Sequence, residues 1–331
     1  MRIFCLALSA LLLAGCETLA YYGQAAGGQL SLMGRTQPVE QVLADPAAAP
    51  ALKARLALAG QIRDFAAREL RLPDSGAYRG YAELGRPYAL WNVVAAPEFS
   101  LEPVRSCFPV AGCVSYRGYY DKAAAERHAQ GLRETGHDVV VYGVPAYSTL
   151  GWFDDPLLST FIDYPEADLA RLMFHELAHQ LLYVKDDSPF NESFAVVVER
   201  EGLKRWLGTR GRDAELAQWR AREARSRELN GQIAAARERL QALYRSRLDA
   251  AAMRERKRAE LDGLRPLLAR LHRFEGQEPN NAVLASLATY ADLVPAFEKL
   301  LAEAGGDLPA FYARVRTLAA LEPSQRKAAL R

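Results

Sequence analysis

The sequence predicts an α+β fold that is mostly helical and contains a small mixed sheet. Short runs rich in aromatic and β-branched residues indicate strands at 88–96, 114–120 and 138–144. Apolar residues at helical spacing in 51–70 and 169–199 indicate helices, and we expect the sheet to pack on the second of these stretches. The stretch 210–265 alternates arginine, glutamate and alanine with apolar residues near heptad spacing, which predicts a long, charged helical hairpin arm.

Length and composition favour one main domain with an accessory element. Half of the 331 residues are hydrophobic, which is enough for a sizeable core. The net charge is only +2, so the composition gives no argument for a nucleic-acid partner. We expect the main domain to comprise residues 51–209, with the sheet and the metal-binding helices, and a C-terminal helical part at 266–331. The arm at 210–265 would be the accessory element, and its mixed charge predicts either a solvated surface or a site for a protein partner.

The N-terminus has the features of an export signal. Arg2 is followed by an apolar stretch at 3–13, which is too short to span a bilayer as a helix. The sequence Leu13-Ala14-Gly15-Cys16 resembles the bacterial lipobox, which implies removal of residues 1–15 and lipidation of Cys16. The alternative is an ordinary secretory signal with an incidental cysteine. Residues 16–50 then predict a lipidated tether, so the membrane would be reached by a lipid anchor only.

The residue after Cys16 bears on localisation within the cell envelope. Glu17 rather than aspartate follows the cysteine, and by resemblance to Gram-negative lipoproteins this implies the periplasmic face of the outer membrane. An oxidising periplasm also permits a disulfide between Cys107 and Cys113, across a short segment that contains proline and glycine. The alternative for these two residues is a pair of reduced, buried cysteines.

The strongest motif in the chain is His175-Glu176-x-x-His179. Histidines at positions i and i+4 lie on one face of a helix, so both imidazoles can reach one metal ion. Glu176 lies beside them, where a carboxylate can take a proton from a metal-bound water. The alternative is a buried amphipathic helix whose polar residues satisfy one another. Only five histidines occur in the chain, which makes a chance match to this motif rare.

A catalytic zinc site usually has three protein ligands and an open position for water. Glu192 follows the second histidine by thirteen residues, after the polar stretch 185–189, whose proline favours a turn. A helix, a turn and a second helix would bring Glu192 back to the histidines. We therefore predict one Zn²⁺ per chain, bound by His175, His179 and Glu192, although Glu192 could instead be an ordinary carboxylate at the start of a helix.

With these motifs in place, the chain resembles a bacterial family of predicted zinc aminopeptidases. The segments that carry the resemblance are 91–100, 146–153 with 155–158, 174–179, 191–195 and 280–290. The resemblance implies a gluzincin-like fold and peptide hydrolysis, with Glu176 as the general base. It also implies that an edge strand just before the metal helix binds the peptide by backbone pairing. That strand would contain Ala146, Tyr147, Ser148, Thr149, Leu150 and Gly151. The alternative is an ordinary core strand followed by a turn.

Two departures from better-understood gluzincins affect this interpretation. The Gly-x-Met-Glu-Asn motif that holds the free amine of the substrate in the large aminopeptidase group does not occur here. Thermolysin-like enzymes also place an acid four residues after the third ligand, where this chain has Val196. Glu199 could accept a hydrogen bond from a ligand histidine instead, or it could be a surface carboxylate.

Two residues near the C-terminus are further candidates for substrate binding. Asn281 or Tyr290 could return to the metal cleft and hold a substrate carbonyl, whereas a helix cap is the simpler role for the neighbouring Asn280. The predicted activity is that of a zinc metallopeptidase acting on peptides, in the first place an aminopeptidase. The alternatives are an envelope endopeptidase that uses the same site, or a non-catalytic zinc-binding lipoprotein that docks a partner through its helical arm.

Overall fold

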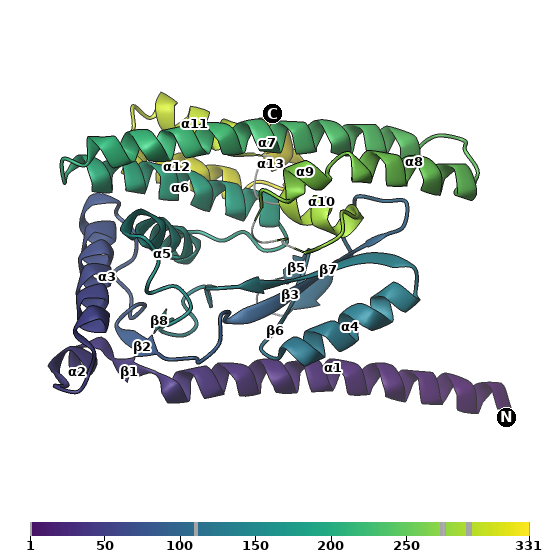
Figure 1. The fold of residues 1–331 in the computed structure, drawn as a ribbon, viewed down its shortest axis with the longest axis horizontal. Helices are drawn as coiled ribbons and strands as arrows, with labels where there is room; N and C mark the ends of the chain where they lie inside the picture. The colour runs from purple at the N-terminus through teal and green to yellow at the C-terminus, as the bar shows by residue number, and fades with distance from the viewer. Residues whose placement is uncertain (1, 109–111, 272–273, 275, 289–292, 331) are drawn as a thin grey trace.

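The computed structural model describes residues 2–108, 112–271, 274, 276–288 and 293–330. Helices dominate and the strands form small sheets, which confirms the predicted α+β class. Figure 1 shows a central sheet between two sets of helices. One set lies above the sheet and includes α6, α7, α8 and α10, whereas α4 and α1 lie below it. Among the described residues, no helix is long and apolar enough to cross a membrane.

The central sheet has the strand order β6-β3-β7 and is antiparallel throughout. Its strands are β3 (Leu90–Pro97), β6 (Arg117–Tyr119) and β7 (His137–Val144). The pairing of Val93 with Val141 and of Val94 with Val140 points alternate side chains to opposite faces. Both faces are apolar, because helices cover both of them.

The lower face of this sheet packs on α4 (Lys122–Glu134), through Trp91, Val93 and Ala95. Asp121 caps this helix, because its side chain accepts a hydrogen bond from the amide of Ala124. Two further sheets are small. The order β1-β2-β8 joins β1 (Gln37–Pro38), β2 (Gly80–Ala82) and β8 (Leu157–Leu158). The hairpin of β4 (Ser106–Phe108) and β5 (Gly112–Val114) carries a disulfide between Cys107 and Cys113.

The N-terminal segment corrects the prediction of a tether. Residues 16–50 contain most of the second half of helix α1 (Arg2–Arg35), then α2 (Val39–Ala44) and the start of α3 (Pro50–Glu69). From Leu19 onward α1 packs on the domain, with Leu32 buried. Gly28 permits the close approach, because a Cβ atom there would lie 2.2 Å from the ring of Tyr120. Gly28 therefore serves the packing of α1 on the domain.

The predicted edge strand at 146–153 is wrong. These residues form an irregular loop between β7 and β8. The Asp155 carboxylate accepts a hydrogen bond from the amide of Thr149 at 2.8 Å, and the Thr149 hydroxyl accepts one from the amide of Phe153 at 3.1 Å. Such side-chain bonds satisfy backbone groups locally and compete with strand pairing. Leu150 and Gly151 also have positive φ angles, 56° and 80°, which an extended strand excludes.

The stretch 210–265 forms α7 (Asp213–Tyr244) and α8 (Ala250–Asp262), which pack against each other. The hairpin lies along the top of the molecule and does not project as a free arm (Figure 1). Its heptad-spaced apolar residues cover the upper face of the central sheet, where Leu229, Ile233, Ala236 and Leu240 share a buried cluster with Val94, Val140 and Tyr142. Lys257 fixes α8 to the sheet, because its Nζ donates to Asp138 at 2.7 Å and to the carbonyl of Glu98 at 2.8 Å.

The C-terminal part is helical, as expected, and consists of α9 (Arg265–Leu268), α10 (Asn281–Ala288), α11 (Val294–Glu303), α12 (Leu308–Ala319) and α13 (Pro323–Ala329). Helix α10 packs on β3 and β7. Helices α11 and α12 pack on α6 (Ser188–Gly208) through aromatic contacts, in which Phe194 meets Phe297 and Phe311. These helices therefore support the second of the two metal-site helices.

Candidate metal centre

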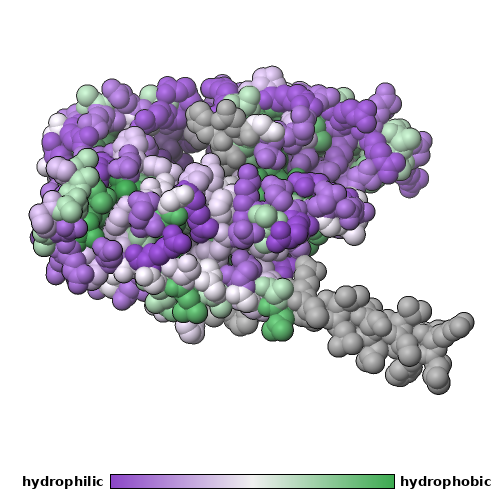
Figure 2. Space-filling view, turned by 60° about the horizontal axis from the view of Figure 1, so that its bottom comes forward, coloured by the Kyte–Doolittle hydropathy of each residue, from purple (hydrophilic) through white to green (hydrophobic). Residues whose placement is uncertain are grey.

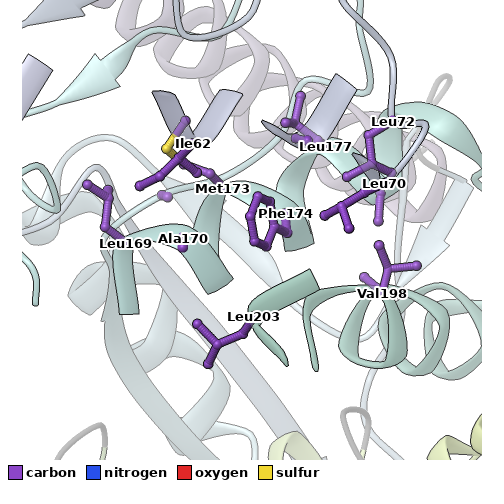
Figure 3. Packing of buried hydrophobic residues seen from close by; sticks show 14 of the residues in the cluster. Ile62, Leu70, Leu72, Leu169, Ala170, Met173, Phe174, Leu177, Val198 and Leu203 are labelled. Carbon is purple, nitrogen blue, oxygen red and sulfur yellow. The ribbon is translucent and has the colours of Figure 1, made fainter. Parts of the chain in front are cut away.

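The candidate site is built on α5 (Glu166–Leu181) and α6. The apolar face of α5 lies in the main core, where Phe174 packs among Ile62, Leu70, Val198 and Leu203 (Figure 3). Gly202 of α6 allows the two helices to approach closely, because a Cβ atom there would lie 2.7 Å from the Phe174 ring and 2.8 Å from Leu70. With one face of α5 fixed in the core, the polar side chains of the motif face the other way.

Hydrogen bonds fix the turn between α5 and α6. The Asn191 amide binds both backbone groups of Val184, since its oxygen accepts from the Val184 N–H at 2.7 Å and its nitrogen donates to the Val184 carbonyl at 2.8 Å. Asp187 caps α6 by accepting from the amide of Phe190, and it also pairs with Arg326 of α13 at 2.8 Å. Both contacts determine where α6 begins, and Glu192 lies directly after its first turn.

The two histidines and Glu192 converge on one point. His175 Nε2 lies 3.3 Å from a Glu192 carboxylate oxygen, and His179 Nε2 lies 3.7 Å from the other oxygen. The two histidine Nε2 atoms are 3.2 Å apart. One ligand atom from each of the three residues lies within 4.8 Å of the others, with His179 buried and the other two residues half-buried. The structure therefore brings together the three ligands that the sequence predicted.

Glu199 lies behind the ligands and orients one of them. Its Oε2 is 3.0 Å from His175 Nδ1, and its Oε1 accepts from Arg171 at 2.5 Å. Because an ionised carboxylate can only accept, Nδ1 of His175 donates to Glu199, and Nε2 is the nitrogen that faces Glu192 and His179. Burial alone would raise the pKa of Glu199, but Arg171 and His175 lower it to about 2. Glu199 is therefore a buried hydrogen-bond acceptor for His175 and not a surface carboxylate.

Glu176 is half-buried and follows His175 on α5. Its carboxylate interacts electrostatically with the hydroxyls of Tyr78 and Tyr116. Burial, together with Glu192 and Asp155, raises its pKa to about 7, although His175 acts in the opposite direction. Burial lowers the pKa of His179 to about 4, which favours the neutral imidazole that a metal requires. For His175, burial opposes protonation, but the hydrogen bonds to Glu192 and Glu199 prevail and raise its pKa.

These residues fit a bound divalent metal. Two imidazole nitrogens and a carboxylate face one another at 3.2 to 3.7 Å, and the other nitrogen of His175 is held by Glu199. A set of two histidines and one glutamate suits zinc and also suits other first-row divalent ions.

Several predicted substrate-binding residues have other roles. Asn281 is buried, donates to the carbonyl of Glu98 at 2.9 Å and accepts from the Tyr244 hydroxyl at 2.7 Å, so it joins α10 to β3 and α7. Its neighbour Asn280 caps α10 by accepting from the amide of Val283. Tyr290 lies outside the described residues. In the loop at 146–151, Ala146 is buried and the Tyr147 hydroxyl is 2.5 Å from Gln29 of α1.

Sequence reasoning missed three residues of the site, and one of them carries a spacing signal. Arg171 lies one helical turn before His175. Tyr183 lies beyond the end of α5, where its ring packs edge-on to the imidazole of His179 with the centroids 6.4 Å apart. Asn191 precedes Glu192 directly, but its role depends on the backbone of a turn that the sequence does not specify.

Comparisons with known proteins address the family of the chain. Searches of curated proteins and of solved structures found no match. One protein-family model, described as "Putative aminopeptidase", matches residues 20–330. The match extends from α1 to α13 and includes both metal-site helices, so the chain belongs to this family.

Proposed function

We propose that the protein is a zinc-dependent metallopeptidase, and in the first place an aminopeptidase. The observation that carries the proposal is the convergence of His175, His179 and Glu192 on one point, with Glu176 on the same helix as the histidines. Membership of the aminopeptidase family supports the reaction class. When bound, zinc would polarise the scissile carbonyl and lower the pKa of a coordinated water.

The residues of the chain have separate tasks in this proposal. Glu176 removes a proton from the attacking water and passes it to the nitrogen of the leaving amine. Glu199 holds the His175 ring through Nδ1, and Arg171 holds Glu199. The apolar side of α5 keeps the motif rigid, because it lies in the core. A second candidate is an endopeptidase that uses the same residues, which is favoured by the absence of the Gly-x-Met-Glu-Asn motif from the sequence.

The first test compares the full chain with its Glu176→Gln variant. We expect the variant to bind one equivalent of zinc and to lose measurable peptide hydrolysis, because the amide cannot accept the proton. Glu228→Gln is the matched control, since Glu228 is exposed on α7. Retained hydrolysis in Glu176→Gln would exclude this mechanism. A non-catalytic binding protein would instead bind zinc and cleave no peptide in either form.

A matched pair of peptides, one with a free N-terminus and one acetylated, separates the two candidate activities. Cleavage of only the free peptide would establish an aminopeptidase, whereas cleavage of both would establish an endopeptidase. The measurement uses the native chain and the Glu176→Gln variant in parallel, so that cleavage by a contaminating peptidase is recognised.

We also propose that the enzyme is anchored by lipid at Cys16 and acts at the periplasmic face of the outer membrane. The support is the sequence Leu13-Ala14-Gly15-Cys16-Glu17. Incorporation of labelled fatty acid into the native chain, and its loss in Cys16→Ala, would establish the anchor. Fractionation of the inner and outer membranes tests the location.

A further inference from the structure

We propose that the outward side of helix α1 lies on a lipid bilayer and seats the domain against the membrane. The outer α1 face consists of Leu19, Tyr22, Ala26, Leu30 and Met33, which are all exposed. Leu19 is 75% exposed and Leu30 is 67% exposed. The spacing of three and four residues places the five side chains on one side of the helix. This inference rests on the proposed anchor at Cys16 and not on the peptidase activity.

The opposite side of α1 is occupied by contacts with the domain. Gln24 accepts from the amide of Tyr120 at 3.1 Å, and Gln29 accepts from the Tyr120 hydroxyl at 2.6 Å. Arg117 lies over the ring of Tyr21, 4.0 Å from its centroid, and Leu32 is buried in the main core. The rotation of α1 about its axis is therefore fixed, and the outer α1 face has no described contact that covers it.

The outer α1 face lacks charge, unlike the other exposed helix surfaces of this protein. No aspartate, glutamate, lysine or arginine occurs between residues 18 and 34, although a quarter of the whole chain is charged. By contrast, the exposed side of α7 carries Arg222, Arg225 and Glu228. In Figure 2, which brings the bottom of Figure 1 forward, hydrophobic residues appear in green along the lower edge of a largely hydrophilic face. Contiguous exposed apolar residues mark an interaction site.

The position of Cys16 identifies a bilayer as the partner. Leu19 follows Cys16 by three residues, so a lipid on Cys16 holds the start of the outer α1 face within about 11 Å of the membrane even if the link is fully extended. Helix α1 leads directly back to that cysteine. An apolar helix face held at this distance partitions into the interface between head groups and acyl chains. The absence of charge predicts that neutral lipids are sufficient.

The experiment measures where the outer α1 face lies when the protein is on vesicles. The mature chain is purified from membranes and reconstituted in phosphatidylcholine vesicles, with a spin label at Leu30→Cys or Met33→Cys. Arg222→Cys, exposed on α7, is the control position. Accessibility to oxygen, which concentrates in the bilayer, is compared with accessibility to a water-soluble nickel chelate. We expect the oxygen-to-nickel ratio at positions 30 and 33 to exceed that at position 222 severalfold.

Two results would overturn the inference. Nickel accessibility at positions 30 and 33 equal to that at 222 would mean that the domain stands away from the membrane. A label that neither reagent reaches, and whose spin–spin broadening disappears when unlabelled chain is added, would mean that the outer α1 face binds a second copy of the chain.

The mass of the N-terminal peptide reports separately whether Cys16 carries lipid. If the lipid is absent, flotation of Leu30→Glu/Met33→Glu against the native chain tests the contact, and equal flotation would overturn it.

Discussion

His175 is held from both sides. Its Nε2 faces the Glu192 carboxylate at 3.3 Å and its Nδ1 meets Glu199 at 3.0 Å. Arg171 in turn pairs with Glu199. The Glu199 carboxylate therefore contacts a partner with each of its two oxygens, Arg171 with one and His175 with the other. Carboxylates that hold the second nitrogen of a ligand histidine fix the orientation of the ring and raise its basicity as a ligand. In the proposed metal site, part of the affinity would therefore come from residues that do not contact the metal.

Replacing Glu199 by alanine is expected to weaken metal binding by about 10–100-fold, because His175 loses the acceptor that orients it. Arg171→Met should have a smaller effect in the same direction. Competition with a chromogenic chelator measures the affinity. Glu201→Gln is the matched control, since Glu201 lies on the same helix but pairs with Lys204 and Arg205. An unchanged affinity in Glu199→Ala would show that the contact has no part in metal binding.

The residues of the site differ in how far the sequence determines them. His175, Glu176 and His179 were predictable because helix geometry alone places residues four apart on one face. The position of Glu192 depends on the shape of the turn before α6. The side chains of Asn191 and Asp187 fix that turn, because they accept hydrogen bonds from the backbone amides of Val184 and Phe190. The role of Glu199 could not be decided from the sequence, because it depends on how α6 is rotated about its own axis relative to α5. That rotation is fixed by packing contacts, such as the close approach of Gly202 to Phe174.

At the scale of elements, the long hairpin and α10 are bound to the central sheet by buried polar contacts. Asp138 accepts from Lys257 of α8 and from the amide of Asn281 at the start of α10, at 2.7 and 2.8 Å. The side chain of Asn281 donates to the carbonyls of Pro97 and Glu98 at the end of β3. Hydrogen bonds made by a buried amide are costly to lose, and Asn281 is fully buried.

Asn281→Ala is therefore expected to lower the free energy of unfolding by about 1–3 kcal/mol, because the bonds of the buried amide to the carbonyls of Pro97 and Glu98 and to the Tyr244 hydroxyl are lost. Peptide hydrolysis measured well below the unfolding temperature should be unchanged. Urea unfolding and steady-state kinetics provide the two measurements. Gln241→Ala on the exposed side of α7 is the control and should stay within about 0.5 kcal/mol of the native chain. A selective fall in kcat with stability unchanged would restore Asn281 as a substrate-binding residue.

Most of the elements were predictable, and the errors have specific causes. The strands β3 and β7 and the helix α3 lie where the periodicity and composition place them. The loop at 146–153 was mistaken for a strand because the sequence does not reveal that Asp155 would bind the amide of Thr149. The role of Asn281 was also not predictable, because its partners Pro97 and Glu98 lie 184 and 183 residues earlier in the chain.

A metal at this site would connect α5 to α6 and, through α6, to the C-terminal helices. Phe190 and Phe194 of α6 pack on Phe297 of α11, and Arg326 of α13 pairs with Asp187. A ligand that binds only the folded state stabilises that state in proportion to the logarithm of its concentration.

Removal of metal by a chelator is expected to lower the melting temperature, and zinc at about 100 times its Kd should restore about 2.7 kcal/mol. Calorimetry of the metal-free chain across a series of zinc concentrations measures this. The shift should disappear in His179→Ala and persist in Glu228→Gln. If His179→Ala retained the full shift, zinc would be binding elsewhere on the chain.

The candidate centre lies entirely on two consecutive helices, α5 and α6, which supply its five groups: His175, Glu176, His179, Glu192 and Glu199. The centre is therefore local in the chain, whereas the strands and helices that surround it come from distant positions. Contacts of low sequence separation form early, because little loop-closure entropy opposes them. The helix pair is thus suited to assemble before the sheet is covered, and a metal ion captured at that stage would act as a nucleus for the folding of the domain.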